Sequence, residues 1–95
     1  MTLSGFQELI KQIYFEKDRK RGLAETFMWF IEEVGELSRA LLKNDTPRMR
    51  EEFADVAAWL VSTASIAGID IEEAVRKYEN GCPKCVRTPC RCRER

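Results

Sequence analysis

The stretch FIEEVGELSRALL, residues 30–42, places three carboxylates, those of Glu32, Glu33 and Glu36, in one of the most apolar segments of the chain. A charge that is taken out of water costs several kcal/mol unless a partner compensates it. Residues three positions apart are neighbours on a helix, so Glu33 and Glu36 project from the same side. The stretch therefore predicts a largely apolar helix whose acids require an identifiable partner.

Helical periodicity continues along the chain, and no segment alternates with the period of two that is typical of strands. Ser4 and Gln7 form a capping box at the expected first start, and Asp70 caps the expected last helix. Gly22 and the turn at residues 44–47 separate the elements between them. The fold class is therefore all-α, with helices expected at about residues 4–21, 23–43, 47–67 and 70–80.

The second and third expected helices form a central antiparallel hairpin, because two long helices joined by a short turn must pack that way. If the hairpin folds about residue 44, acids from the two helices meet at matching levels, with a tryptophan layer at one end. The matching pairs are Glu33 with Asp55, Glu36 with Glu52, and Trp29 with Trp59. Four converging carboxylates repel one another unless some keep a proton or a cation binds them.

The sequence contains no histidine, so a metal site in this hairpin would use carboxylate oxygens alone. Mg²⁺ and Mn²⁺ prefer oxygen ligands, which favours either ion over zinc at these acids. The alternative, which spacing leaves open, is a solvated acidic surface neutralised by basic side chains. The basic residues in reach are Arg39, Lys43, Arg48 and Arg50.

The acids in EEVGE, residues 32–36, and fifteen residues later in EFAD, residues 52–55, resemble the ExxE and ExxD motifs of MazG-like nucleotide pyrophosphohydrolases. This all-α NTP pyrophosphatase group also includes dimeric dUTPases and phosphoribosyl-ATP pyrophosphohydrolases. The segment GIDIEEAVRKYEN, residues 68–80, is similar to the family's segment after its second motif. The resemblance covers about residues 6–80.

The resemblance implies Mg²⁺-dependent cleavage between the α- and β-phosphates of a nucleoside triphosphate, which yields a monophosphate and pyrophosphate. Glu33 and Glu36 match ExxE, and Glu52 and Asp55 match ExxD, so these four acids are the implied metal ligands and catalytic residues. One of them, or neighbouring Glu32 or Glu51, would orient or deprotonate the attacking water.

The resemblance also implies a basic residue and an asparagine that meet phosphates near the end of the last helix. Asn80 matches the asparagine, and Arg76 or Lys77 matches the basic residue, with Arg76 on the same helix face as Asn80. An ordinary helix C-terminus is the alternative. Trp29 and Trp59 are interpreted as core residues, with stacking on a base as the alternative, for which Trp29 is the better candidate.

The resemblance implies a homodimer or homotetramer with sites near subunit interfaces. Independently, residues 27–31, FMWFI, are consecutively apolar, and one chain of this length cannot cover them on every side. We therefore expect residues 1–80 to form a helical domain that completes its bundle by oligomerisation. The charge run at residues 17–21 is interpreted as solvated, with contact to phosphates across a subunit interface as the alternative.

Sixteen basic and sixteen acidic residues cancel, so net charge gives no reason to expect nucleic acid or a membrane as the partner. No apolar run approaches the roughly 18 residues of a membrane span, and the start lacks the layout of a signal peptide. The cytoplasm is the expected compartment.

Residues 81–95 form a basic tail that contains CPKCVRTPCRC. Four thiolates match the ligand count of a structural zinc site, although the usual pattern separates its pairs by about 15–20 residues. Disulfides and a reduced tail without fixed structure are the alternatives. A closed four-thiolate site has no open position, so we expect no catalytic role. The four cysteines are Cys82, Cys85, Cys90 and Cys92.

The functional interpretation is a metal-dependent nucleotide pyrophosphohydrolase that removes non-standard or surplus nucleoside triphosphates. A phosphoribosyl-ATP pyrophosphohydrolase on the same scaffold is the enzymatic alternative. A non-enzymatic helical dimer, whose zinc tail binds a nucleic acid or a protein, is the alternative from another class. Pyrophosphate release across a panel of nucleotides separates these three hypotheses.

Overall fold

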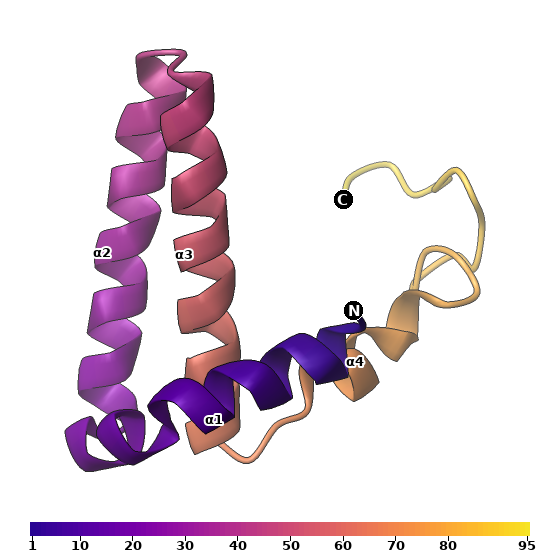
Figure 1. Ribbon diagram of the computed structural model, residues 1–95. Helices are drawn as coiled ribbons and strands as arrows, with labels where there is room; N and C mark the ends of the chain where they lie inside the picture. The colour runs from indigo at the N-terminus through magenta and orange to yellow at the C-terminus, as the bar shows by residue number, and fades with distance from the viewer.

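The computed structural model describes residues 1–95 and contains helices and loops without strands (Figure 1). The all-α class and the order of four helices are therefore confirmed. The elements are α1 (Leu3–Arg21), α2 (Leu23–Leu42), α3 (Thr46–Ile66), α4 (Ile71–Ala74) and the 3-10 helix η1 (Val75–Tyr78).

The α2–α3 hairpin stands as two long antiparallel helices, and its turn follows the expected chemistry (Figure 1). Asn44 takes a positive φ of 53°, and the Asp45 side chain accepts a hydrogen bond from the Arg48 N–H at 3.2 Å. The rings of Trp29 and Trp59 stack with centroids 6.4 Å apart. This contact confirms the expected register of the hairpin.

The start of α1 differs from the sequence-based expectation. Thr2 is the N-cap, and its side chain accepts a hydrogen bond from the Gly5 N–H at 2.9 Å. The predicted capping box of Ser4 and Gln7 is wrong, because both side chains bond to the distant segment around Asp70 instead. Tertiary contacts have replaced the local cap that their spacing suggested.

The last helix is also shorter than expected. The Asp70 side chain caps α4 by accepting from the Glu72 N–H at 3.0 Å, as predicted. The α-helix ends at Ala74, and a single 3-10 turn continues to Tyr78. Asn80 therefore lies in a turn and not in the helix that the sequence predicted.

Helix α1 runs across the lower end of the hairpin and packs mainly against α3, so the molecule has an open, angular shape (Figure 1). Gly22 makes the corner between α1 and α2 with a φ of 90°, which L-residues with a side chain rarely adopt. Arg21 closes the corner by donating to Asp18 at 2.9 Å and to the Thr26 hydroxyl at 3.3 Å. Both acceptors are buried, which fixes the direction of α1.

The apolar core of the chain is small. Its buried apolar side chains are Ile10, Ala40, Val61 and Ala64. By contrast, α2 exposes Phe27, Met28 and Ile31, of which Met28 is 70% exposed. Monomeric proteins rarely leave contiguous apolar surface of this kind in water, so these residues support the expected oligomer. No single helix is long and apolar enough to cross a membrane. Helix α3 and the α4–η1 segment reach the required length and composition only when they are counted as one segment, and a bend of 94° separates them.

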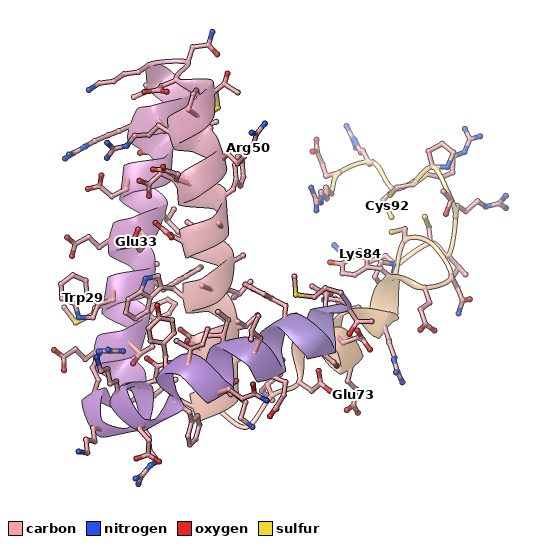
Figure 2. The ribbon with its side chains drawn as sticks, in the orientation of Figure 1. Trp29, Glu33, Arg50, Glu73, Lys84 and Cys92 are labelled. Atoms are coloured by element: carbon pink, nitrogen blue, oxygen red, sulfur yellow. The ribbon has the colours of Figure 1, made fainter.

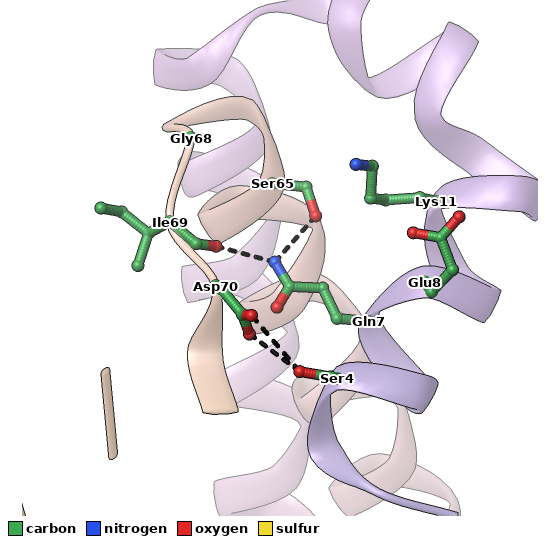
Figure 3. A pocket seen from close by; sticks show the side chains of 8 residues that line it. All are labelled: Ser4, Gln7, Glu8, Lys11, Ser65, Gly68, Ile69 and Asp70. Atoms are coloured by element: carbon green, nitrogen blue, oxygen red, sulfur yellow. Dashed lines mark hydrogen bonds between the residues drawn. The ribbon is translucent and has the colours of Figure 1, made fainter. Parts of the chain in front are cut away.

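Gln7 joins the start of α1 to the loop between α3 and α4. Its amide nitrogen donates to the Ser65 hydroxyl at 3.0 Å and to the Ile69 carbonyl at 2.8 Å, and its oxygen accepts from the Ile71 N–H at 2.9 Å. Gln7, Ser65 and Ile69 border a cavity of about 460 Å³ (Figure 3). One buried amide thus satisfies two backbone groups of the connecting loop.

Replacing Gln7 by leucine should lower the free energy of unfolding by about 1–3 kcal/mol, because the loop loses its hydrogen-bond partners. Urea unfolding at fixed protein concentration measures the change. Gln12→Leu is the matched control, since Gln12 is an exposed glutamine on the same helix. Equal losses in both variants would show that Gln7 does not hold α1 to the loop.

Candidate functional site

Three of the four predicted acids meet between α2 and α3. Glu33 comes from the middle of α2 (Figure 2), and Glu52 and Asp55 come from successive turns of α3. One carboxylate oxygen from each residue lies within 4.8 Å of the others. The hairpin register therefore produces a compact cluster of oxygen donors, which we call the acid cluster.

Glu52 is the most buried member of the acid cluster, with 7% of its surface exposed. One of its oxygens lies 3.5 Å from the Arg48 guanidinium, whereas its Oε2 atom is buried without any hydrogen-bond partner. Buried polar atoms in native proteins are nearly always paired, so an orphaned carboxylate oxygen needs an explanation. A cation bound at the acid cluster would provide one.

The pKa of Glu33 is raised above its usual value of 4.5. Burial is the main cause, followed by the negative charges of Asp55, Glu52 and Glu36. Without a cation, the cluster therefore favours a protonated Glu33, which is one of the two ways of relieving carboxylate repulsion that the sequence predicted. Three oxygen donors, an orphaned oxygen and this raised pKa together fit a divalent cation.

Glu36 lies one turn further along α2 and outside the acid cluster. Its carboxylate accepts from Arg48 at 3.2 Å and lies 4.0 Å from Arg39. Arg48 thus bridges Glu36 and Glu52, as the salt-bridge alternative anticipated for this part of the hairpin. The role of Glu36 as a metal ligand stays a prediction.

A cavity of about 320 Å³ lies beside Asp55, between α1 and α3. Its lining includes the cations Lys17 and Arg21 and the ring of Trp59, and the Arg21 guanidinium sits 5.0 Å from the centre of that ring. The interpretation of residues 17–21 as a solvated run missed this cavity. Lys17 and Arg21 are spaced i, i+4, which was the available signal that they share one face of α1.

Trp29 is 42% exposed and stacks on Trp59 from the α2 side of the hairpin (Figure 2). The core interpretation therefore does not describe Trp29 in the single chain. Its free face lies one helical turn from Glu33, which keeps base stacking a prediction for this residue.

Arg76, Lys77 and Asn80 are exposed and lie on η1 and the turn after it. Arg76 pairs with Glu79 at 3.9 Å, and the Lys77 ammonium lies 5.2 Å from the ring centre of Tyr78. The α4–η1 segment packs on the far end of α1, away from the hairpin (Figure 1). One chain therefore does not bring these three residues to its own acid cluster.

The four cysteines form a second cluster in the tail, with their sulfurs within 4.8 Å of one another. Backbone N–H groups of Cys85 and Lys84 lower the pKa of the Cys82 thiol to about 6. The thiols of Cys90, Cys85 and Cys82 raise the pKa of Cys92 to about 12. The pKa of Cys85 is also lowered and that of Cys90 is also raised, so the cluster favours thiolates at Cys82 and Cys85 and opposes ionisation at Cys90 and Cys92.

A family model for the MazG nucleotide pyrophosphohydrolase domain matches residues 21–86. The chain belongs to the MazG family. The match contains the acid cluster, Glu36 and the α4–η1 segment, and it ends one residue after Cys85. MazG proteins act on nucleotides as pyrophosphohydrolases and typically use divalent metals. No curated protein matches this MazG chain.

The raised pKa of Glu33 predicts how the stability of this MazG protein depends on pH without Mg²⁺. Ionising Glu33 costs more in the folded than in the unfolded state, so its contribution to stability is lost as pH rises from about 4.5 through the folded pKa. Glu33→Gln cannot ionise. Its melting temperature should match the parent's below pH 4.5 and exceed it increasingly above that pH.

Adding Mg²⁺ should raise the melting temperature of the parent and leave Glu33→Gln nearly unchanged, because bound cations stabilise the folded state. Thermal unfolding by circular dichroism measures both trends. Glu16→Gln, which removes an exposed carboxylate from α1, controls for the loss of one negative charge. A difference in melting temperature between the parent and Glu33→Gln that did not change with pH would contradict the raised pKa of Glu33.

Proposed function

We propose that this MazG protein is a cytoplasmic, Mg²⁺-dependent nucleoside triphosphate pyrophosphohydrolase. It cleaves the bond between the α- and β-phosphates and releases a nucleoside monophosphate and pyrophosphate. The acid cluster with its orphaned Glu52 oxygen is the observation that supports this proposal. Its physiological role is the removal of non-standard or surplus nucleotides.

Glu33, Glu52 and Asp55 would hold the Mg²⁺, with Glu36 binding from the next turn of α2. Mn²⁺ suits the same oxygens. When bound, the ion would offset the charge of the phosphates and lower the pKa of the attacking water. An acid-only donor set fits this chemistry, because Mg²⁺ in proteins is usually held by carboxylates together with substrate phosphates.

The remaining steps fall to side chains of the chain itself. The oxygen of water bonds to the phosphorus on one side of the α–β bridge while the P–O bond to the bridging oxygen breaks. A carboxylate of the acid cluster, or that of neighbouring Glu32 or Glu51, accepts the proton of the water. Lys17 lines the cavity beside Asp55 and would offer positive charge to phosphates there, whereas the Arg21 guanidinium is already paired with Asp18. Trp29 offers its exposed face to the base.

The active unit is a homodimer or homotetramer. The exposed apolar residues of α2 would be covered by another subunit, and Arg76, Lys77 and Asn80 of one subunit would reach the phosphates at the acid cluster of another. Two observations support this arrangement: the apolar surface of α2, and the position of η1 away from the hairpin of its own chain.

Asp55→Asn and Glu52→Gln should each lower pyrophosphate release by about 100-fold or more. Mutation of a residue that only supports a metal ligand typically lowers activity by about 10–100-fold, and a larger loss is expected here because these two residues are proposed ligands. The assay follows pyrophosphate with and without Mg²⁺ across a nucleotide panel that includes phosphoribosyl-ATP.

Glu16→Gln is the matched control, because it removes an exposed carboxylate that lies on α1 outside the cluster. Its turnover should equal the parent's. Parent-like rates in Asp55→Asn and Glu52→Gln, with their helices intact by circular dichroism, would contradict the site. A parent protein that releases no pyrophosphate from any substrate would instead favour the non-enzymatic helical dimer.

Mixing two inactive variants tests whether Asn80 acts across the interface. Asp55→Asn and Asn80→Ala should both be inactive alone, and unfolding and refolding them together should restore about a quarter of the parental sites in a random dimer. Each mixed dimer then has one complete site. A mixture of Asp55→Asn with Glu52→Gln should restore no activity, because both changes lie in the acid cluster of one subunit. If the mixture with Asn80→Ala also restored no activity, Asn80 would not act at the acid cluster of another subunit.

A further inference from the structure

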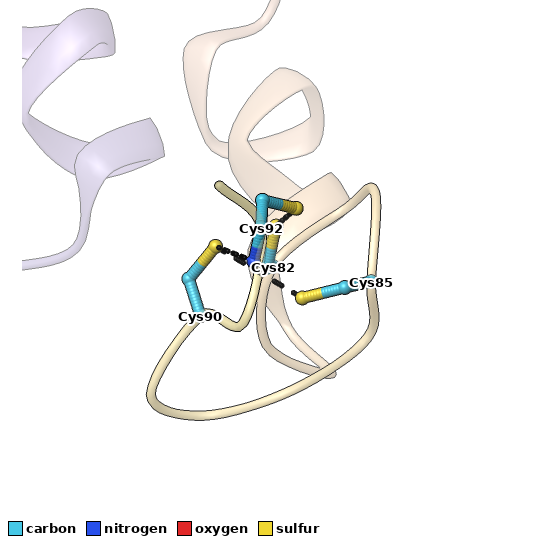
Figure 4. A group of neighbouring side chains, drawn as sticks. All are labelled: Cys82, Cys85, Cys90 and Cys92. Carbon is cyan, nitrogen blue, oxygen red and sulfur yellow. Dashed lines mark hydrogen bonds between the residues drawn. The ribbon is translucent and has the colours of Figure 1, made fainter. Parts of the chain in front are cut away.

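The tail holds a group of side chains that nucleotide hydrolysis does not use. Cys82 and Cys85 lie on one loop, Cys90 and Cys92 lie on the next, and the four sulfurs converge between the loops (Figure 4). The Sγ atoms of Cys82 and Cys92 are 3.8 Å apart, and those of Cys85 and Cys90 are 3.9 Å apart. All four sulfurs lie within 4.8 Å of one another.

These separations fit a tetrahedral metal site better than disulfides. Four thiolates arranged tetrahedrally at about 2.3 Å from a zinc ion lie about 3.8 Å from one another. A disulfide brings two sulfurs to about 2.05 Å and leaves no reason for both pairs to share one centre. Here each loop contributes one sulfur to each close pair, so the sulfurs surround a common point.

Backbone N–H groups hold the first loop and contact two of the cysteine sulfurs, as is common around metal ligands. The Val86 N–H donates to the Cys82 carbonyl at 2.7 Å, which closes the first loop into a tight turn. The Arg91 N–H lies 3.4 Å from the Cys85 sulfur, and the Cys92 N–H lies 3.3 Å from the Cys90 sulfur. Such second contacts orient ligands and stabilise their charged form.

Close packing of the two loops depends on Gly81. Its φ is 102°, and a Cβ atom at this position would lie 2.7 Å from the Thr88 hydroxyl and 3.0 Å from the Arg87 carbonyl group. Any side chain at Gly81 would therefore push the second loop away from the first. The loops meet closely enough to share the four sulfurs because this residue is glycine.

The charge of the tail suits a tetrathiolate centre. A zinc ion with four thiolates carries two negative charges, which nearby cations stabilise. The tail supplies five basic side chains against the single acid Glu94. The basic residues are Lys84, Arg87, Arg91, Arg93 and Arg95.

We propose that Cys82, Cys85, Cys90 and Cys92 bind one Zn²⁺ ion in a closed structural site that folds residues 81–95. Four protein ligands leave no open position, so the site links the two loops and takes no part in hydrolysis. Binding displaces the thiol protons without any change of oxidation state. The site is independent of the acid cluster, which offers oxygen ligands alone.

Metal analysis of the full-length protein, purified under reducing conditions, tests the proposal. We expect about one zinc per chain in the parent, and loss of that zinc in the double variant Cys90→Ser/Cys92→Ser. Asp55→Asn is the matched control, because it damages the acid cluster and should keep its zinc. Gly81→Ala should weaken zinc binding in a chelator competition while all four thiols remain.

Cobalt provides a second measurement that does not depend on activity. Co²⁺ added to the metal-free parent should give the absorption bands of a tetrahedral thiolate complex, and the double variant should give none. Failure of the reduced parent to bind either zinc or cobalt would overturn the proposal. Iron in the four-thiolate site, or intact disulfides found by mass spectrometry after reducing purification, would also overturn it.

Discussion

Repulsion among carboxylates that are forced together is the constraint on which the rest of this structure depends. The packing that stacks Trp29 on Trp59 also holds Glu33, Glu52 and Asp55 within 4.8 Å of one another. Apolar packing therefore maintains an arrangement that disfavours charge on Glu33, whose pKa is raised first by burial and then by the negative charges of its neighbours. The packing of α2 against α3 thus keeps one oxygen donor from each of these three acids close together.

The hairpin could be predicted because helical geometry and a short turn leave one antiparallel register. That register placed Glu33 opposite Asp55 and Trp29 opposite Trp59 without any tertiary information. Glu36 departs from the predicted cluster because Arg48 bonds to its carboxylate. Residue spacing gives the level of a side chain on a helix, whereas its choice between two nearby partners depends on rotamers.

Features that depend on long-range contacts were harder to predict. The path of α1 requires the positive φ of Gly22 and the buried pair of Asp18 with Arg21. The spacing of Lys17 and Arg21 places them on one face of α1, but only the path of α1 brings that face to the cavity beside Asp55. The capping pattern of Ser4 and Gln7 pointed to a local role, but both side chains bond across the fold. The family match begins at residue 21 and so does not describe α1.

Arg48 serves as an internal counterion, since it contacts Glu36 at 3.2 Å and Glu52 at 3.5 Å. The charges of these two acids are thus partly neutralised within the folded chain. A divalent ion at the acid cluster would compete with this guanidinium, so its net affinity would be reduced by the free energy of the displaced pairs. Under the proposed function, occupancy of the cluster would then follow the concentration of free Mg²⁺, and hydrolysis would respond to the ionic composition of the solution.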